Sequence, residues 1–263
     1  MLKKLLKYDI QNVSKVLAIF YSLSIFFAIL TRLFLSIENS FIMNVIGKIC
    51  SGVTISMIFN IIINNIMRLW HRFKSNFYGD ESYLTHTLPI NKKTLYLSKT
   101  LTSVIMLFIS MLVIVISLFF AYYSKENLTI VKNLLLPLAT VYDSTMVTIV
   151  LAFVFVFFLE IMNMLQSGYV GIVLGHKKNN NKMLYSVLFG FGTYILTQVF
   201  TILCVFIVAL FNSDLMNLFY TVDTLSVSTI KLCIYLAIII YTINIFVLYI
   251  VNLKLFNKGV NVD

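Results

Sequence analysis

Composition and charge place this chain outside the ordinary soluble proteins. It has 263 residues, of which 60% are hydrophobic and only 11% are charged, whereas a soluble domain is about 25% charged. The net charge of +10 would suggest a nucleic-acid partner in a soluble protein. Here the basic residues fall in short loops between apolar runs, where they set orientation in a bilayer. We therefore expect a membrane protein whose partners include the lipid bilayer and no nucleic acid.

Residues 1–15 precede the first long apolar run and have a basic amphipathic pattern. Leu2, Leu5, Leu6 and Val13 share one helical face, and three lysines lie largely beside or opposite it. This pattern is typical of an interfacial helix on an anionic membrane surface. The apolar run that follows is too long for a signal peptide and has no small-residue cleavage site behind it.

Six apolar runs are long enough to cross a hydrocarbon core, which takes roughly 20 helical residues. The chain must be helical through them, because no backbone group can stay unpaired in lipid. Strands of a membrane barrel would be shorter and would alternate in polarity. The predicted fold class is an all-α integral membrane protein in a single domain, residues 1–263, with spans at 16–35, 41–67, 100–123, 144–166 (extending to 174), 184–211 and 231–253.

The distribution of Lys and Arg among the loops predicts the orientation. Most of the 20 basic residues lie in the N-terminal segment, in the loops after the second and fourth spans, and in the C-terminal tail. By the positive-inside rule these segments are cytoplasmic, and so are both termini. On the other side, residues 124–143 and 212–229 are partly apolar loops. Either loop can dip back into the outer leaflet, and for the second a surface helix is equally consistent.

Several kinds of chemistry lack their motifs. There is no GxxxxGK[ST] phosphate loop, so the chain does not bind ATP by that route, and no HExxH or GxSxG sequence occurs. Cys50, Cys204 and Cys233 lie far apart in apolar sequence, which favours packing over a metal or disulfide role. The three histidines are not grouped at metal-ligand spacing. We expect no catalytic residues, no metal site and no cofactor on this chain.

Glu160 is the most distinctive ionisable residue in the predicted spans. If the fourth span is one continuous helix to residue 174, Glu160 lies near mid-membrane, where a carboxylate is costly and is usually functional or neutralised. If the helix leaves lipid near Gln166, the carboxylate is close to the inner interface. Asn163 and Gln166 follow Glu160 at i+3 and i+6 and extend a polar stripe. These three residues form a candidate intramembrane polar site, with structural packing and a transport or proton role both open.

The cytoplasmic loop 68–99 carries the strongest local signal. Residues 66–77 read as an amphipathic continuation of the second span, Gly79 breaks that helix, and Asp80 can cap a new short helix through Tyr83 and Leu84. Pro89 ends the short helix. The result is a transverse helix below the membrane, with acidic residues at its start and apolar anchors that suit a groove on a partner.

This loop resembles the first cytoplasmic loop of ABC-2 type transporter permeases. In that family an acidic, aromatic short helix is followed by a T-L-P-[VI]-[SN]-[RK] stretch and a leucine/lysine lead into the third span. The corresponding residues here are Asp80, Glu81, Tyr83 and Leu84, then Thr87, Leu88, Pro89, Ile90, Asn91 and Lys92, and finally Leu97, Ser98 and Lys99. Asn91 and Lys92 stand where Ser and Arg are more usual, which keeps hydrogen bonding and charge.

The resemblance implies the permease subunit of an ATP-driven exporter in a bacterial cell membrane. Two permeases, identical or homologous, would pair, and two nucleotide-binding ATPase subunits carrying ATP and Mg²⁺ would dock beneath them. The coupling residues would be Asp80, Glu81, Tyr83, Leu84 and Pro89. The cargo would be a peptide, a drug or a lipid-like molecule. We therefore expect that this chain is not itself an enzyme.

Three other functions remain open at this stage. One is the substrate-binding membrane subunit of a vitamin importer, which is normally shorter and lacks the long first cytoplasmic loop. Another is a membrane-embedded enzyme using Glu160 with His176, which needs a second catalytic group that the sequence does not display. The third is a structural or immunity protein that sequesters a toxin.

Overall fold

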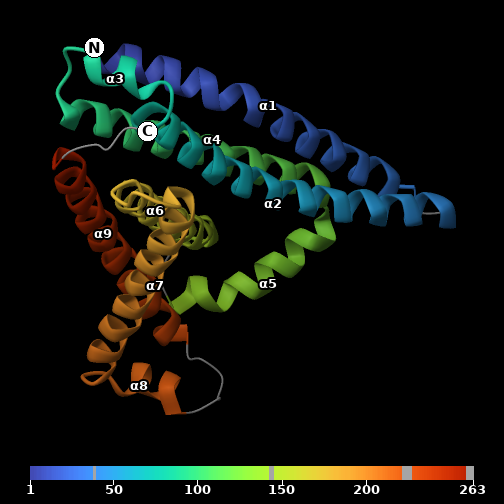
Figure 1. Ribbon diagram of the computed structural model, residues 1–263. Helices are drawn as coiled ribbons and strands as arrows, with labels where there is room; N and C mark the ends of the chain where they lie inside the picture. Colours follow the sequence, from blue (N-terminus) through green and yellow to red (C-terminus); the bar gives the residue numbers. More distant parts are fainter. Residues whose placement is uncertain (38–39, 142–144, 221–226, 259–263) are drawn as a thin grey trace. The chain divides into compact units, whose positions relative to one another are not determined.

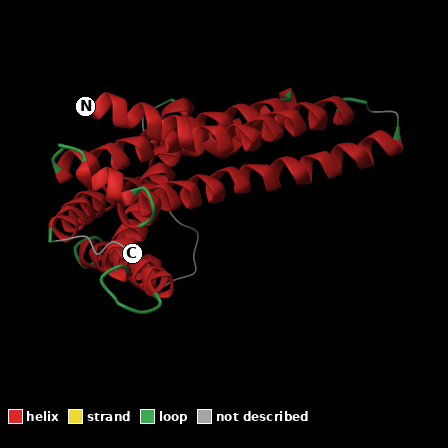
Figure 2. Ribbon diagram, turned by 45° about the horizontal axis from the view of Figure 1, so that its top comes forward, coloured by secondary structure: helices red, strands yellow, loops and turns green. Residues whose placement is uncertain are grey.

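The computed structural model describes residues 1–37, 40–141, 145–220 and 227–258. Within these ranges the secondary structure is entirely helical, in helices α1 to α9 (Figure 1, Figure 2). Among them are six helices long and apolar enough to cross a membrane. The prediction of an all-α protein with six candidate spans is therefore confirmed. The cytoplasmic position of the termini stays a prediction.

The chain divides into two compact units, which are described separately below. Unit 1 comprises Met1–Leu128 and unit 2 comprises Thr129–Asp263. The boundary falls within a single helix, α5 (Lys125–Val141). Whether the two units act as the one domain expected from the sequence stays a prediction.

Unit 1 is built from three long helices and one short helix. The long helices are α1 (Leu2–Leu35), α2 (Phe41–Tyr78) and α4 (Lys92–Tyr122), which pack side by side along much of their length (Figure 1). The short helix α3 (Ser82–Thr87) contacts α2. The start of α1, the end of α2, α3 and the start of α4 thus lie at the same end of unit 1.

Small polar side chains hold the long helices of unit 1 together. Ser24 on α1 donates to Ser117 on α4 at 3.0 Å, and the hydroxyls of Thr31 on α1 and Thr54 on α2 are 3.1 Å apart. Asn65 on α2 donates to the main-chain oxygen of Met106 on α4 at 3.0 Å. Between membrane helices, such short side chains allow close approach and supply hydrogen bonds where the apolar surroundings offer no other partner.

Two helices of unit 1 continue well beyond the predicted spans. The predicted span 16–35 is the second part of α1, which begins at Leu2 without a break, so residues 2–15 are not a separate helix. Likewise α2 runs through residues 66–77 to Tyr78, which confirms the predicted continuation. Whether the first turns of α1 lie on a membrane surface stays a prediction.

Unit 2 contains three long helices and two shorter ones. The long helices are α6 (Met146–Gly175), α7 (Lys182–Ala209) and α9 (Val227–Asn257), and α6 packs against both others. The sequence-predicted loop 124–143 is largely the helix α5, with Pro137 inside it. Within the other predicted loop, residues 213–220 form α8 (Ser213–Tyr220), which contacts α7. Asp143 and Asp223, which belong to these loops, fall outside the described residues.

Glycine lets α6 and α7 approach at their backbones. A Cβ atom on Gly171 would collide with main-chain atoms of Gly190 and Ser186, and one on Gly175 would collide with Ser186. Because main-chain atoms are involved at both positions, a rotamer change alone cannot relieve the collision. Small residues at such crossings are typical of helices packed in a membrane.

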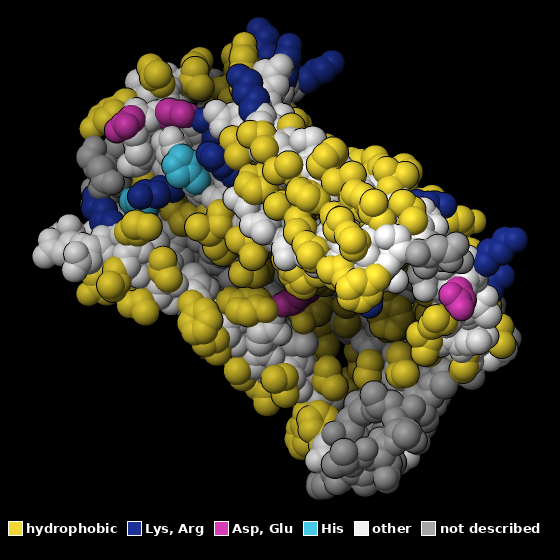
Figure 3. Space-filling model, turned by 90° about the vertical axis from the view of Figure 1, so that its right-hand side faces the viewer, with side chains coloured by type: hydrophobic (Ala, Val, Ile, Leu, Met, Phe, Trp, Pro, Cys, Tyr) yellow, Lys and Arg dark blue, Asp and Glu magenta, His cyan; other side chains and the backbone are white. Residues whose placement is uncertain are grey.

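Apolar side chains dominate the exposed surface of the described residues. Figure 3 shows one face largely covered by them, with Lys and Arg gathered in small groups. In the most apolar stretch of α7, only 6% of the residues are buried. A soluble monomer rarely exposes apolar surface on this scale, so the surface agrees with a multi-pass membrane protein.

Candidate functional site

The loop that follows α2 folds close to its predicted form. Gly79 ends α2 in an extended conformation, and α3 begins at Ser82. The expected N-cap, Asp80, is one residue off: Glu81 occupies that position, and its side chain makes no capping hydrogen bond. The helix ends at Thr87, and Leu88 is extended, as the residue before a proline usually is. The predicted break at Pro89 is thus confirmed.

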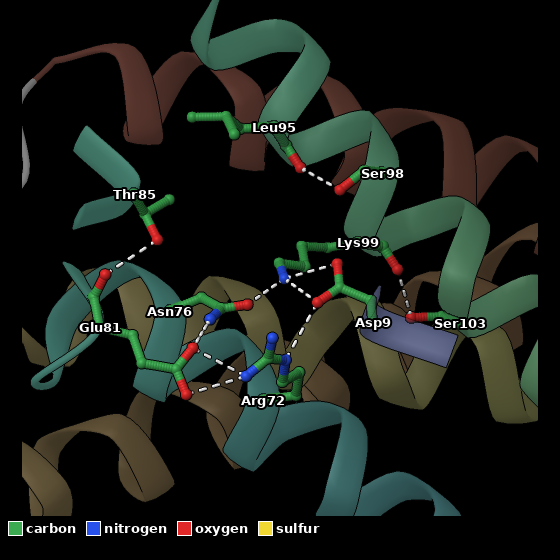
Figure 4. Close-up of polar contacts among 9 residues, drawn as sticks. All are labelled: Asp9, Arg72, Asn76, Glu81, Thr85, Leu95, Ser98, Lys99 and Ser103. Atoms are coloured by element: carbon green, nitrogen blue, oxygen red, sulfur yellow. Dashed lines mark hydrogen bonds and ion pairs between the residues drawn. The ribbon is translucent and has the colours of Figure 1, made fainter. Parts of the chain in front are cut away.

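Glu81 turns back toward α2 instead of capping α3. Its carboxylate accepts two hydrogen bonds from Nη1 of Arg72, at 2.9 and 2.7 Å, and one from the side-chain amide of Asn76 (Figure 4). The Thr85 hydroxyl donates to the main-chain oxygen of Glu81 at 2.9 Å. The loop is therefore fastened to the last turns of α2 by a charged side chain.

A second carboxylate completes this cluster from α1. Asp9 is 3% exposed and accepts hydrogen bonds from Nζ of Lys99 at 2.6 and 2.7 Å and from Nε of Arg72 at 3.0 Å. Lys99 also donates to the Asn76 side chain. We call these five residues, Asp9, Arg72, Asn76, Glu81 and Lys99, the ion-pair cluster.

The ion-pair cluster is balanced in charge, with two carboxylates against one guanidinium and one ammonium. Isolated charges would be costly at this degree of burial, but paired and hydrogen-bonded charges are tolerated. Arg72 uses its fork to bridge Asp9 and Glu81, a geometry that lysine cannot reproduce. The ion-pair cluster thereby connects α1, α2, α4 and the loop before α3.

Four of the five sequence-predicted coupling residues lie at the surface of unit 1. Asp80 and Pro89 are exposed, while Tyr83 is 63% exposed and Leu84 is 75% exposed. Glu81 is also partly exposed, but its carboxylate is engaged in the ion-pair cluster. Thus the described loop presents an acidic residue and two large apolar side chains outward on a short helix fixed from behind.

In unit 2, the continuous form of the fourth span is the one observed. Glu160 lies at the midpoint of the 30-residue helix α6. Its Oε1 atom accepts hydrogen bonds from the Tyr194 hydroxyl at 2.6 Å and from Nε2 of Gln198 at 2.8 Å. Tyr241 on α9 adjoins the same carboxylate and donates a long hydrogen bond of 3.5 Å to Oε1 of Gln198. We call these four residues the Glu160 cluster.

Asn163 and Gln166 extend this polar stripe but turn to different neighbours. Asn163 is buried and donates to the Thr197 hydroxyl on α7 at 3.1 Å. Gln166 is buried against α9, where Nδ2 of Asn252 donates to its main-chain oxygen at 3.1 Å. The three predicted residues therefore line one face of α6, where Glu160 and Asn163 are bonded to α7 and Gln166 is bonded to α9.

Glu160 and His176 do not form one catalytic group. They are separated by 16 residues on α6, which is roughly 24 Å along a helix. His176 is buried, with Nδ1 2.8 Å from the main-chain oxygen of Ile172. Among the described residues no group of three His, Cys, Asp or Glu side chains is placed to hold a metal ion.

Sequence reasoning misses most partners in both clusters. The sequence pattern presents Asp9 and Arg72 only as parts of amphipathic segments, and it does not single out Tyr194 or Tyr241. A lone acidic residue in a basic segment, as at Asp9, is the available signal. Its partner Lys99 lies 90 positions away, which no local pattern can reveal.

No protein-family model, no curated protein and no solved structure matches this chain. The family resemblance of the cytoplasmic loop therefore rests on the loop residues themselves.

Proposed function

We propose that this chain is the membrane permease subunit of an ATP-driven exporter of the ABC-2 type. A separate nucleotide-binding ATPase, holding ATP and Mg²⁺, would dock on α3 from the cytoplasm. A second permease, identical or homologous, would complete the assembly in a bacterial cell membrane. The cargo would be a peptide, a drug or a lipid-like molecule, and this chain would carry out no hydrolysis itself.

One observation carries this proposal. Tyr83 and Leu84 are largely exposed on a six-residue helix at the polar end of unit 1. Large apolar side chains on a short helix are the usual anchors for a groove on a partner protein. Residues anchoring a span in lipid would instead lie on a long apolar helix, and α3 is too short to cross a bilayer. The TLPINK sequence that follows supports the family assignment.

The ion-pair cluster supplies a physical route for coupling. A force applied to α3 acts on Glu81, which is bonded to Arg72 on α2. Arg72 and Lys99 in turn hold Asp9 on α1. Because these contacts are charged and mostly buried, the three long helices would move with α3. A partner that binds one arrangement more tightly would then shift the population of the bundle toward it.

The proposal is tested with the purified full chain and the P-loop ATPase encoded by an adjacent gene. We expect the two to form a complex, with the Tyr83→Ala/Leu84→Ala variant losing it and losing any stimulation of ATP hydrolysis. The matched control is Tyr235→Ala/Leu196→Ala, which removes the same exposed side chains from α9 and α7. Normal binding and stimulation by the Tyr83/Leu84 variant would show that α3 is not the docking element.

A further inference from the structure

We propose that the Glu160 cluster is a binding site for an amphiphilic organic cation. The interpretation of that cation as cargo rests on the exporter function proposed above. The binding itself does not, since the site lies wholly in unit 2.

The Glu160 cluster contains no positive charge to balance its carboxylate. The hydrogen-bond donors on Glu160 are a tyrosine hydroxyl and an amide, both neutral. The described residues form no ion pair with Glu160, whereas Asp9 has both Lys99 and Arg72. In addition, α6 carries no Lys or Arg along its whole length. Among the described residues, none is paired with Glu160 as a counter-charge.

The hydrogen bonds on Glu160 are also one-sided. Both donors act on Oε1, while Oε2 is buried and accepts no hydrogen bond from a described residue. A buried acceptor that lacks a donor is costly, and more so when it belongs to a charged group. The Tyr241 hydroxyl adjoins the carboxylate and makes a long hydrogen bond of 3.5 Å to Gln198. A ligand that brings a positive charge would satisfy this oxygen and offset the cost together.

The surrounding side chains favour an organic cation over a metal ion. Calcium and magnesium ions take at least six oxygen ligands. The side chains of the Glu160 cluster contain about five oxygens, and one of them, Oε1 of Gln198, already accepts from Tyr241. Tyrosine rings, by contrast, attract ammonium and similar cations to their faces. Tyr194 and Tyr241 approach the carboxylate from two different helices, which suits an organic cation between them.

The side chains of the Glu160 cluster, Glu160, Tyr194, Gln198 and Tyr241, are each partly exposed. Ile195 follows Tyr194 on α7, and Ile202 lies one turn after Gln198. Both flank the cluster on the same side of the helix and are apolar and exposed. A ligand with a cationic centre and apolar substituents would place its charge at the carboxylate and its substituents along α7. This arrangement defines the chemical class as a lipophilic cation.

The test measures binding of tetraphenylphosphonium to the full chain in nanodiscs of phosphatidylcholine, with empty nanodiscs as background. Tetraphenylborate is the matched anion, since it has the same shape and opposite charge. We expect saturable binding of the cation and none of the anion. In Glu160→Gln the cation should bind at least roughly tenfold more weakly, because the charge partner is lost. Glu126→Gln, which removes an exposed carboxylate on α5, should bind as the wild type does.

Two results would overturn the proposal: equal affinity of wild type and Glu160→Gln for the cation, or no saturable binding to the wild type. If Glu160→Gln fails to fold, as judged by its elution from a sizing column, Tyr194→Phe provides the second variant. It keeps the ring and removes the 2.6 Å hydrogen bond, so it should bind the cation with altered affinity and still reject the anion. Unchanged affinity in a folded Tyr194→Phe variant would also contradict the site.

The outcome is independent of the ATPase. The Tyr83→Ala/Leu84→Ala variant should bind tetraphenylphosphonium with wild-type affinity even where it no longer recruits the ATPase. If the cation binds through Glu160 but no ATPase associates with the wild type, the exporter function fails and the cation site stands. If the ATPase associates with the wild type and the cation does not bind, the cation site fails and the exporter function stands.

Discussion

Asp9 and Glu160 are both carboxylates within long helices, but the two units neutralise them differently. Asp9 in unit 1 accepts hydrogen bonds from an ammonium and a guanidinium, at 2.6 to 3.0 Å. Glu160 in unit 2 accepts, among the described residues, from the Tyr194 hydroxyl and the Gln198 amide, both on Oε1. The Asp9 carboxylate is thus fully used in contacts that stabilise unit 1. The Glu160 carboxylate has no Lys or Arg partner among the described residues.

The two units also differ in what holds their helices together. At the end of unit 1 that carries α3, buried charges connect three helices and a loop. In unit 2, α6 and α7 touch through their backbones at Gly171 and Gly190. Charge pairs depend on partners staying ionised, whereas backbone contact depends on the absence of a side chain. The predictions below use these differences, in order of decreasing expected effect.

The largest effect is expected from Lys99→Met, which keeps the length of the side chain and removes its charge. Asp9 would lose two of its three hydrogen bonds while staying buried, and breaking such a pair costs about 3–5 kcal/mol. The measurement is the midpoint of thermal unfolding in detergent, which should fall markedly. Lys93→Met, at an exposed position on the same helix, should leave the midpoint almost unchanged.

A double variant separates this charge effect from a packing effect. If the loss in Lys99→Met comes from the uncompensated carboxylate, adding Asp9→Asn should restore part of the stability. The two substitutions would then be strongly non-additive, as expected for residues in contact. Simple additivity of the two losses would show that the pair contributes little as a pair.

Gly171→Ala tests the backbone contact in unit 2. The new methyl group would collide with main-chain atoms of Gly190 and Ser186, so α6 and α7 must separate, at a cost of about 1–3 kcal/mol. Gly52→Ala on α2 is the control, since no atom of a neighbouring element lies within 4 Å of the place that its methyl group would take. That substitution should be neutral or slightly stabilising, because alanine favours the helix. Equal changes in stability for the two variants would contradict the close approach of the α6 and α7 backbones.

A smaller effect is expected from Arg72→Lys. Lysine can pair with Asp9 or Glu81 but cannot bridge them as the guanidinium does. Asp9 would keep Lys99, and the Glu81 side chain is 46% exposed, so the pair that is lost is partly screened by water. We expect a loss of about 1 kcal/mol, together with faster proteolysis within residues 79–91. Arg68→Lys, an exposed position one turn earlier, should leave both readouts as in the wild type.

The sequence predicts the six spans well because each needs a long apolar run and nothing else. It predicts the helix ends less well where tertiary contacts extend them. Helix is predicted both in residues 1–15 and from Val16 onward, but the sequence does not predict that the two form one continuous helix from Leu2. Asp9 lies in the first of these two segments, and its two cationic partners lie on α2 and α4.

Some features of the candidate sites can likewise be predicted from the sequence, and others cannot. The short helix after Gly79 and its end before Pro89 are predictable from backbone chemistry alone. The inward turn of Glu81 is not, because it depends on where Arg72 points after α2 and α4 have packed. Glu160 is recognisable as an ionisable residue in an apolar run. Its hydrogen-bond partners on α7 depend on the register between α6 and α7, which the sequence pattern does not contain.

The most direct test of the central claim compares Asp9→Asn with Glu160→Gln in the same detergent, by the midpoint of thermal unfolding. Each substitution removes one carboxylate charge and keeps the shape of the side chain. The account predicts that Asp9→Asn lowers the midpoint substantially, because it leaves Lys99 and Arg72 short of a counter-charge. Glu160→Gln should change it little or raise it, because no cation of the described chain depends on that carboxylate. Equal losses, or a larger loss in Glu160→Gln, would contradict the difference in charge compensation between the two units.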